Sequence, residues 1–161
     1  MYMYVKDIID EDFQDYKKPS MMIAFPICDF KCCREAGIPV SVCQNSSIEK
    51  QKSVQIPFKD IVSRYMSNTV SEAIVFAGLE PMVTFVYVIA LIEEFRRETD
   101  DDIVIYTGYY KDEISVYIDK LKSYKNIIVK FGRFIPNQPH RYDDVLGVEL
   151  SSPNQYAERI S

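Results

Sequence analysis

Residues 73–108 read AIVFAGLEPMVTFVYVIALIEEFRRETDDDIVIYTG. An apolar run at residues 73–77 ends in a glycine, a helical pattern of apolar residues covers 84–98, and a second apolar run at 103–106 again leads to a glycine. Two uninterrupted apolar strands joined by an amphipathic helix are typical of a βαβ unit, in which helices cover a parallel sheet. This stretch therefore predicts an α/β fold.

The flanking sequence repeats the same alternation. Further strands are predicted at residues 20–25 (SMMIAF), 126–131 (NIIVKF) and 145–150, and further helices at 58–68, after Pro57, and at 111–124. The inward face of the helix at 58–68 is predicted to consist of Phe58, Ile61, Val62, Tyr65 and Met66. We expect one domain over residues 1–161, built as a parallel sheet of βα repeats, either a small α/β layer or an incomplete TIM-type barrel.

Charge and hydropathy exclude several classes of partner. The 161 residues carry a formal net charge of -5, whereas a non-specific nucleic-acid binder needs an excess of Lys and Arg. The longest apolar run, residues 83–92, falls short of the ~20 residues that a membrane span requires. The N-terminal segment alternates apolar and acidic residues and lacks the basic start and apolar core of a secretory signal. We therefore expect a cytoplasmic protein that binds neither nucleic acid nor membrane.

All four cysteines lie between residues 28 and 43, with the spacing C-x3-C-C-x9-C. Cytosolic thiols are normally reduced, so such a cluster favours metal or redox chemistry over structural disulfides. Cys32 and Cys33 are adjacent, which makes it hard for both to bind one ion, and three useful ligands is the natural count. A zinc site, an iron-sulfur cluster with one open position and a loop of unliganded thiols all remain open at this point.

Four loops are expected to meet at one edge of the sheet. The carboxyl ends of parallel strands gather on the same side, where α/β proteins bind ligands. The cysteine loop, AGLEP, YTGYY and FGRF follow the predicted strands in that order. Gly78, Gly108 and Gly132 come directly after three of them, where glycine permits close approach of the backbone to a ligand.

The ordered motifs resemble those of a known family. They are Cys28-x3-Cys32, CQN at 43–45, GLEP at 78–81, YTGY at 106–109, GRF at 132–134 and SPNQ at 152–155. Together they are similar to the radical S-adenosylmethionine superfamily, and within it to the activating proteins of anaerobic (class III) ribonucleotide reductases and other glycyl-radical enzymes. The likeness covers most of the chain.

The resemblance implies a 4Fe-4S cluster held by Cys28, Cys32 and Cys43, with Cys33 as an alternative to Cys32. It also implies an S-adenosylmethionine site whose residues are Asn45, Ala77, Gly78, Glu80, Thr107, Gly108 and Arg133. No catalytic side chain beyond the cluster and the cofactor is expected.

In such enzymes a reduced cluster passes one electron to the cofactor, and the resulting 5'-deoxyadenosyl radical abstracts hydrogen from a glycine of a partner. The implied partners are a glycyl-radical protein, first of all the large subunit of anaerobic ribonucleotide reductase, and a flavodoxin- or ferredoxin-type electron donor.

The chain departs from the family pattern at several positions. Ten residues instead of two separate Cys32 from Cys43, Leu79 replaces the second glycine of GGEP, and Phe131 replaces an aspartate. A non-catalytic iron-sulfur or zinc-binding module that only passes electrons is the alternative function. Glu80 either meets the cofactor's ammonium or starts a turn or helix. Arg133 either holds a carboxylate, of the cofactor or of a partner's C-terminal segment, or forms a salt bridge.

Overall fold

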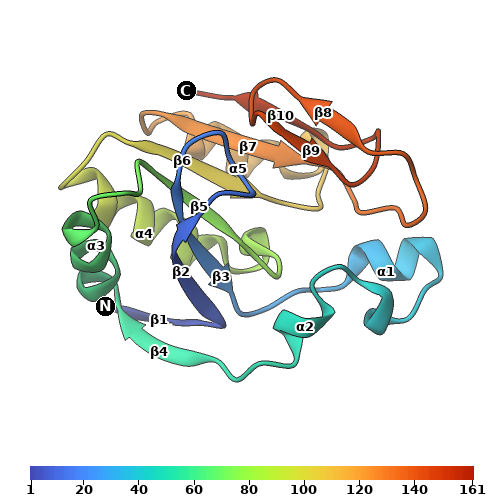
Figure 1. Cartoon of the computed structure of the whole chain (residues 1–161), viewed down its shortest axis with the longest axis horizontal. Helices are drawn as coiled ribbons and strands as arrows, with labels where there is room; N and C mark the ends of the chain where they lie inside the picture. Colours follow the sequence, from blue (N-terminus) through green and yellow to red (C-terminus); the bar gives the residue numbers. More distant parts are fainter.

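Four parallel strands form the centre of a six-stranded sheet in the computed structural model, which describes residues 1–161. Their order is β7-β6-β5-β3, and two antiparallel strands form the edges, β10 beside β7 and β2 beside β3 (Figure 1). The strands are β2 (Asp7–Asp12), β3 (Ser20–Phe25), β5 (Ala73–Gly78), β6 (Asp102–Tyr106), β7 (Ile127–Phe131) and β10 (Tyr156–Arg159). The fold is α/β with a mixed sheet, whereas the apolar runs predicted only its parallel part.

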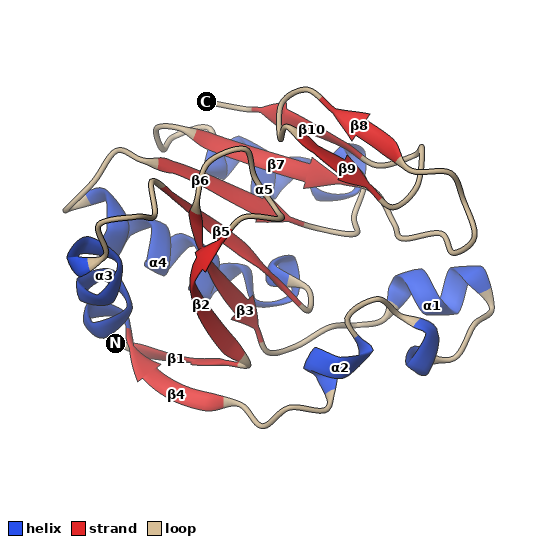
Figure 2. Cartoon of the chain, viewed as in Figure 1, coloured by secondary structure: helices blue, strands red, loops and turns tan.

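Three helices contribute to the core on one face of this sheet: α3 (Phe58–Ser67), α4 (Phe85–Arg96) and α5 (Ser115–Leu121). Figure 2 shows α4 and α5 behind the strands and α3 at the left of the sheet. Their inward side chains pack against alternate residues of the strands in the larger hydrophobic core. α4 buries Val88, Leu91, Ile92 and Phe95 completely. Full burial of one such side chain contributes ~1.5–3 kcal/mol, so this helix supplies much of the stability of the core.

The opposite face of the sheet has smaller side chains and a different cover. Its strand residues include Met22, Ala24, Val75 and Val104. Tyr16 and a short antiparallel hairpin, β8 (Arg141–Asp143) and β9 (Val148–Leu150), pack over these residues in a second hydrophobic cluster. Because no helix of the βα units lies on this face, space remains above it at the carboxyl ends of the strands. The expectation of an incomplete TIM-type barrel stays a prediction.

The N-terminal residues form strands that the sequence did not reveal. β1 (Tyr2–Val5) pairs with β4 (Val54–Pro57) in a separate antiparallel ribbon, and the chain then enters β2. In β1 the side chains of Met3 and Val5 are buried while Tyr2 and Tyr4 are exposed. Such half-exposed strands carry little of the continuous apolar signal on which the prediction relied.

Two of the predicted helices differ in detail. Met66, which we expected on the inward face of α3, is 47% exposed, because it lies at the border of the apolar stripe near the end of the helix. The helix predicted at 111–124 begins as a 3-10 turn (Lys111–Ile114) and ends at Leu121. The apolar residues 83–92 lie in a 3-10 turn and in α4, and no helix is long and apolar enough to cross a membrane.

Replacing Gly78 by alanine should destabilise the protein. Gly78 has φ +80°, and a Cβ there would lie 2.7 Å from the Cα of Ala24 on the neighbouring strand. Left-handed backbone and overpacking together predict a loss of ~2–5 kcal/mol in the free energy of unfolding, measured by urea titration. Gly37→Ala is the matched control, because Gly37 has φ +66° but no atom within 4 Å of the added Cβ. Equal losses in the two variants would contradict the packing argument.

Candidate functional site

The cysteine segment, residues 28–45, starts just beyond the carboxyl end of β3 and lies at one end of the molecule (Figure 1). It was expected to be a loop, but it contains the short helix α1 (Lys31–Ala36) and a 3-10 turn (Val40–Val42), and it is followed by α2 (Ser46–Glu49). Cys32 and Cys33 belong to α1, while Cys28 and Cys43 flank these two turns. The fold thus gives the four thiols a defined scaffold.

Backbone N–H groups point at three of the sulfur atoms. The N–H of Phe30 donates to Cys28 Sγ at 3.2 Å and that of Asn45 to Cys43 Sγ at 3.4 Å. Burial raises the pKa of the Cys28 thiol to about 12 and also raises the pKa of Cys32, where a hydrogen bond from the N–H of Phe134 opposes the rise. These thiols are therefore protonated at neutral pH, and metal ligation must displace their protons.

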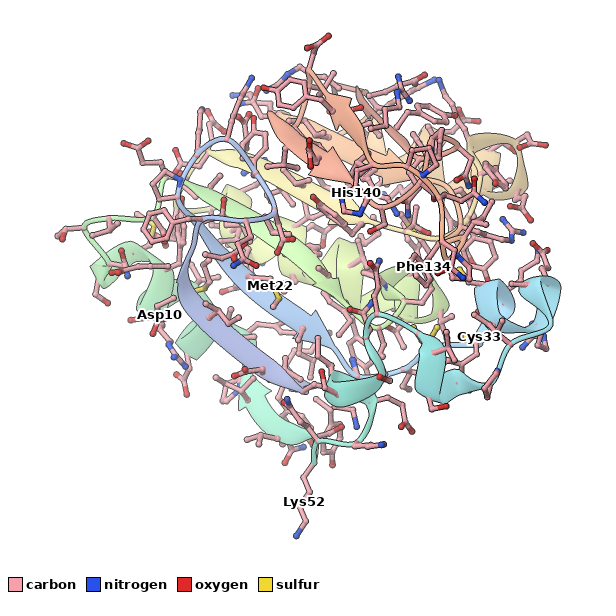
Figure 3. All side chains as sticks on the ribbon, turned by 45° about the vertical axis from the view of Figure 1, so that its right-hand side comes forward. Asp10, Met22, Cys33, Lys52, Phe134 and His140 are labelled. Atoms are coloured by element: carbon pink, nitrogen blue, oxygen red, sulfur yellow. The ribbon has the colours of Figure 1, made fainter.

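Cys32 and Cys33 face different neighbours. A Cβ added to Gly108 would lie 3.0 Å from Cys32 Sγ, so only glycine lets the loop after β6 come this close to the sulfur. The Cys33 side chain is buried, which raises the pKa of its thiol, and the nearby Cys43 thiol adds to the rise. Figure 3 labels Cys33 and also Phe134, which follows β7, and both residues line the cavity described next. Of the two adjacent cysteines, Cys32 is the one that lies against the loop after β6.

One cavity of about 310 Å³ collects these groups. All four cysteines line it, and six of the seven residues predicted to bind the cofactor line it as well: Asn45, Ala77, Gly78, Glu80, Thr107 and Gly108. No three Cys, His, Asp or Glu side chains converge into a ready site for a single ion. An iron-sulfur cube offers its ligand positions on separate iron atoms, so its cysteines lie further apart than those around one ion.

Glu80 joins two of the loops that line the cavity. Its side chain is only 6% exposed and accepts hydrogen bonds from the N–H of Met82 at 3.0 Å and from the N–H of Gly108 at 2.8 Å. Burial raises the pKa of this carboxyl, and the two N–H donors oppose the rise. Glu80 therefore caps the 3-10 turn (Pro81–Thr84), as one of the two sequence-based interpretations proposed, and it lines the cavity at the same time.

Lys130 on β7 is a cavity residue that the sequence analysis missed. It is 5% exposed, and its Nζ donates to the carbonyl oxygens of Thr107 at 3.2 Å and Gly132 at 3.1 Å. Burial lowers the pKa of its ammonium to about 8, while the charge of Glu80 opposes this change. A lysine within the apolar run NIIVKF was the signal that could have identified it, because a charged residue in a buried strand needs a partner.

The far end of the cavity reaches Asp15 and Tyr106. The hydroxyl of Tyr106 donates to the carbonyl oxygen of Asp15 at 2.6 Å. Burial raises the pKa of the Asp15 carboxyl to about 7, and its hydrogen bond with Asp12 contributes to the rise. Carboxyl groups thus line the cavity together with the thiols.

Arg133 is the one predicted cofactor residue that does not line the cavity. Its guanidinium forms a two-pronged ion pair with Glu113, with both N–O distances 2.6 Å, and a further ion pair with Glu35 of α1 at 2.5 Å. It also donates to the carbonyl oxygen of Gly108 at 3.2 Å. Lys31 of α1 reaches the same Glu113 at 2.6 Å. These contacts fasten the cysteine segment to the edge of the sheet.

Comparison with protein families agrees with this arrangement of thiols. Residues 25–155 match the model of a family described as "4Fe-4S single cluster domain". The chain belongs to this family. A search of curated proteins found no match to the chain. The family supports the 4Fe-4S cluster that the resemblance implies, and its match begins at the end of β3 and ends beyond β9.

The residues at the cavity suit the family's 4Fe-4S cluster. Thiolates are the usual ligands of such clusters, and N–H donors to the sulfurs are a known means of tuning them. Gly108 leaves room beside Cys32 that any side chain would fill. Which three cysteines bind the cluster stays a prediction, with Cys28, Cys32 and Cys43 as the expected set.

The two adjacent cysteines offer a test of that set. After anaerobic reconstitution, Cys33→Ala should retain the iron and sulfide content of the wild-type chain, because Cys32 keeps the family spacing from Cys28 and lies against Gly108. Cys32→Ala should lose most of it. Chemical analysis of iron and sulfide per chain, together with visible absorption, measures both variants. The opposite pattern would show that Cys33 is the second ligand.

The ion pair of Glu113 predicts a pH-dependent stability. Arg133, as the main cause, holds the pKa of this carboxyl far below its usual range. A depressed pKa adds stability that is complete above the unfolded-state value of ~4.3 and is lost as the pH falls below it. Glu113→Gln should therefore cost ~1–2 kcal/mol at pH 7 and less at pH 3, where the unfolded carboxyl is already protonated, as measured by urea unfolding.

The matched control is Glu158→Gln, which removes an exposed ion pair with Lys111 and should cost less than ~0.5 kcal/mol. If the free energy of unfolding differed between wild type and Glu113→Gln by the same amount at both pH values, the ion pair would not be the cause of that difference.

Proposed function

We propose that this chain is a radical S-adenosylmethionine enzyme that activates a glycyl-radical protein. The observation that carries the proposal is the meeting of the cysteine segment with the loops after β5 and β6 at one cavity. A domain that only holds a cluster needs no more than the cysteines around it, whereas this cavity extends over the loops after two further strands. Here the motifs GLEP and YTGY line that space together with the thiols.

Cys28, Cys32 and Cys43 would hold the cluster and leave one iron without a cysteine. One-electron reductive cleavage of S-adenosylmethionine is the chemistry that the two groups supply when bound. The chain's own part is to place the thiolates, to bind the cofactor beside them and to exclude water. The N–H groups of Phe30 and Asn45, which already point at two of the sulfurs, stabilise the thiolate form.

The loop after β5 would hold the methionyl part of the cofactor. Its backbone is fixed to the end of β3, because Leu79 N–H donates to Phe25 O at 3.1 Å and Glu80 N–H donates to Ile27 O at 2.8 Å. Leucine at the position of the second family glycine therefore leaves the path of this loop intact. Thr107 and Gly108 would offer carbonyl oxygens from the neighbouring loop, which Glu80 keeps in place through the N–H of Gly108.

The proposed partner is a glycyl-radical protein such as the large subunit of anaerobic ribonucleotide reductase, and a flavodoxin- or ferredoxin-type protein would supply the electron. Both belong to the cytoplasm, which is the proposed location of the chain. Arg133 would have no direct role with the partner, because Glu113 and Glu35 already hold its guanidinium. Its role would be to keep α1 in place.

An electron-transfer module with a cluster is the second candidate, because the matched family is described only by its single cluster. The two functions differ in whether S-adenosylmethionine binds and is consumed. The alternative requires only the cluster, and it predicts that the cofactor has no effect on the reduced protein.

Reductive cleavage of the cofactor tests the proposal directly. The wild-type chain, reconstituted with iron and sulfide without oxygen and then reduced with dithionite, should convert S-adenosylmethionine into 5'-deoxyadenosine and methionine, as measured by liquid chromatography. Cys28→Ala should form no 5'-deoxyadenosine, and dithionite without protein serves as the second control. A fully formed cluster beside intact cofactor would reject the enzyme and favour the electron-transfer module.

A further inference from the structure

Lys130 occupies an unusual position for a lysine. It lies in β7 opposite Tyr106 of β6, in a strand whose residues are all buried. Burying an ammonium group costs free energy unless hydrogen bonds and charges compensate for it. Its two carbonyl acceptors are neutral, and its Nζ lies 5.6 Å from the centre of the Tyr106 ring. An apolar side chain at this position would cost less free energy to bury. The positive charge therefore indicates a role at the cavity.

The cavity contains no other basic side chain. Its acidic residues are Asp15, Glu80 and Glu149. An ammonium group has three N–H donors, and Lys130 uses two of them on the carbonyls of Thr107 and Gly132. The third has no acceptor in the protein. Lys130 is thus the only positive charge available to an anionic group bound in this space.

The amine and Cys32 meet the same loop. The acceptor Thr107 O belongs to the peptide that joins Thr107 to Gly108, and a Cβ built on Gly108 would lie 3.0 Å from Cys32 Sγ. Glu80 Oε2, which accepts from Gly108 N–H, places a negative charge at the same junction. The buried charges at this junction are thus the ammonium of Lys130, the carboxylate of Glu80 and the guanidinium of Arg133, which donates to Gly108 O at 3.2 Å.

We propose that the buried ammonium of Lys130 lies near the sulfur of Cys32. Its positive charge raises the reduction potential of the cluster. This inference rests on the proposed role of Cys32 as a cluster ligand, and it does not depend on S-adenosylmethionine.

The physical reason is electrostatic. Reduction adds one electron, taken from the external reductant, to a cluster that its thiolates already make anionic, and no proton is needed. A positive charge in a buried site interacts strongly with this added charge because water does not screen it. Net charge and hydrogen bonds at the sulfurs are among the main determinants of cluster potential. By the same argument the negative charge of Glu80 destabilises the reduced cluster, and the positive charge of Lys130 offsets this effect.

The experiment compares midpoint potentials of reconstituted chains without S-adenosylmethionine. Lys130→Gln removes the charge but keeps N–H donors for the two carbonyls, whereas Lys130→Met removes both. Each variant should contain as much iron and sulfide as the wild type, and its midpoint potential should shift to more negative values in a dithionite titration followed by electron paramagnetic resonance. Lys122→Met is the control, because Lys122 is on the surface in an ion pair with Asp119 and should leave the potential unchanged.

An unchanged or more positive potential in a cluster-loaded Lys130→Gln chain would overturn the inference. Folding is followed by circular dichroism, and the glutamine variant keeps the test valid if the methionine variant misfolds. The result is separable from the proposed function. If the wild-type chain forms its cluster but leaves S-adenosylmethionine intact, the enzyme is rejected and a shifted potential in the Lys130 variants still supports the inference. If the wild-type chain cleaves the cofactor but the potential of the Lys130 variants is unshifted, only the role of Lys130 is rejected.

Discussion

The geometry of the cavity depends on a buried carboxylate. Glu80 accepts one hydrogen bond from the turn that follows it and one from Gly108 on the next loop, so a single side chain sets the distance between the ends of β5 and β6. Because Gly108 in turn lies against Cys32, the same interaction determines how closely the sheet approaches the thiols. A carboxylate with two backbone N–H donors is a strong anchor, and its burial keeps water from competing.

Charge is arranged in two layers around this anchor. In the inner layer, Glu80 and Lys130 are buried and belong to the cavity. In the outer layer, Arg133, Glu113 and Lys31 link the turns after β6 and β7 to α1. The inner layer acts on whatever the cavity binds, and the outer layer holds the cysteines over it. This division explains why Arg133 does not line the cavity although it follows a strand that does.

The sequence predicted those parts of the fold that have a continuous apolar signal. β3, β5, β6 and β7 are buried on both faces, so their hydrophobic runs identify them without knowledge of their neighbours. The edge strands β2 and β10 contain DIIDED and YAER, half exposed and charged, and they become strands only through pairing with partners distant in the chain.

The site shows the same division. Glycine after a strand and clustered cysteines can be recognised locally, and these residues do line the cavity. The partners of Arg133 and the orientations of Cys32 and Cys33 depend on how α1 packs, which no local pattern records. Lys130 lies within a strand that was predicted correctly. Its place at the cavity, however, could be recognised only once the structure showed that β6 is the neighbouring strand.

The cysteine segment contributes no residue to either hydrophobic cluster, and side-chain ion pairs and hydrogen bonds attach it to the sheet. If this segment left the sheet, both hydrophobic clusters and the hydrogen bonds between the strands would remain intact. The attachment of this segment therefore depends on ion pairs, which salt weakens more than it weakens apolar packing.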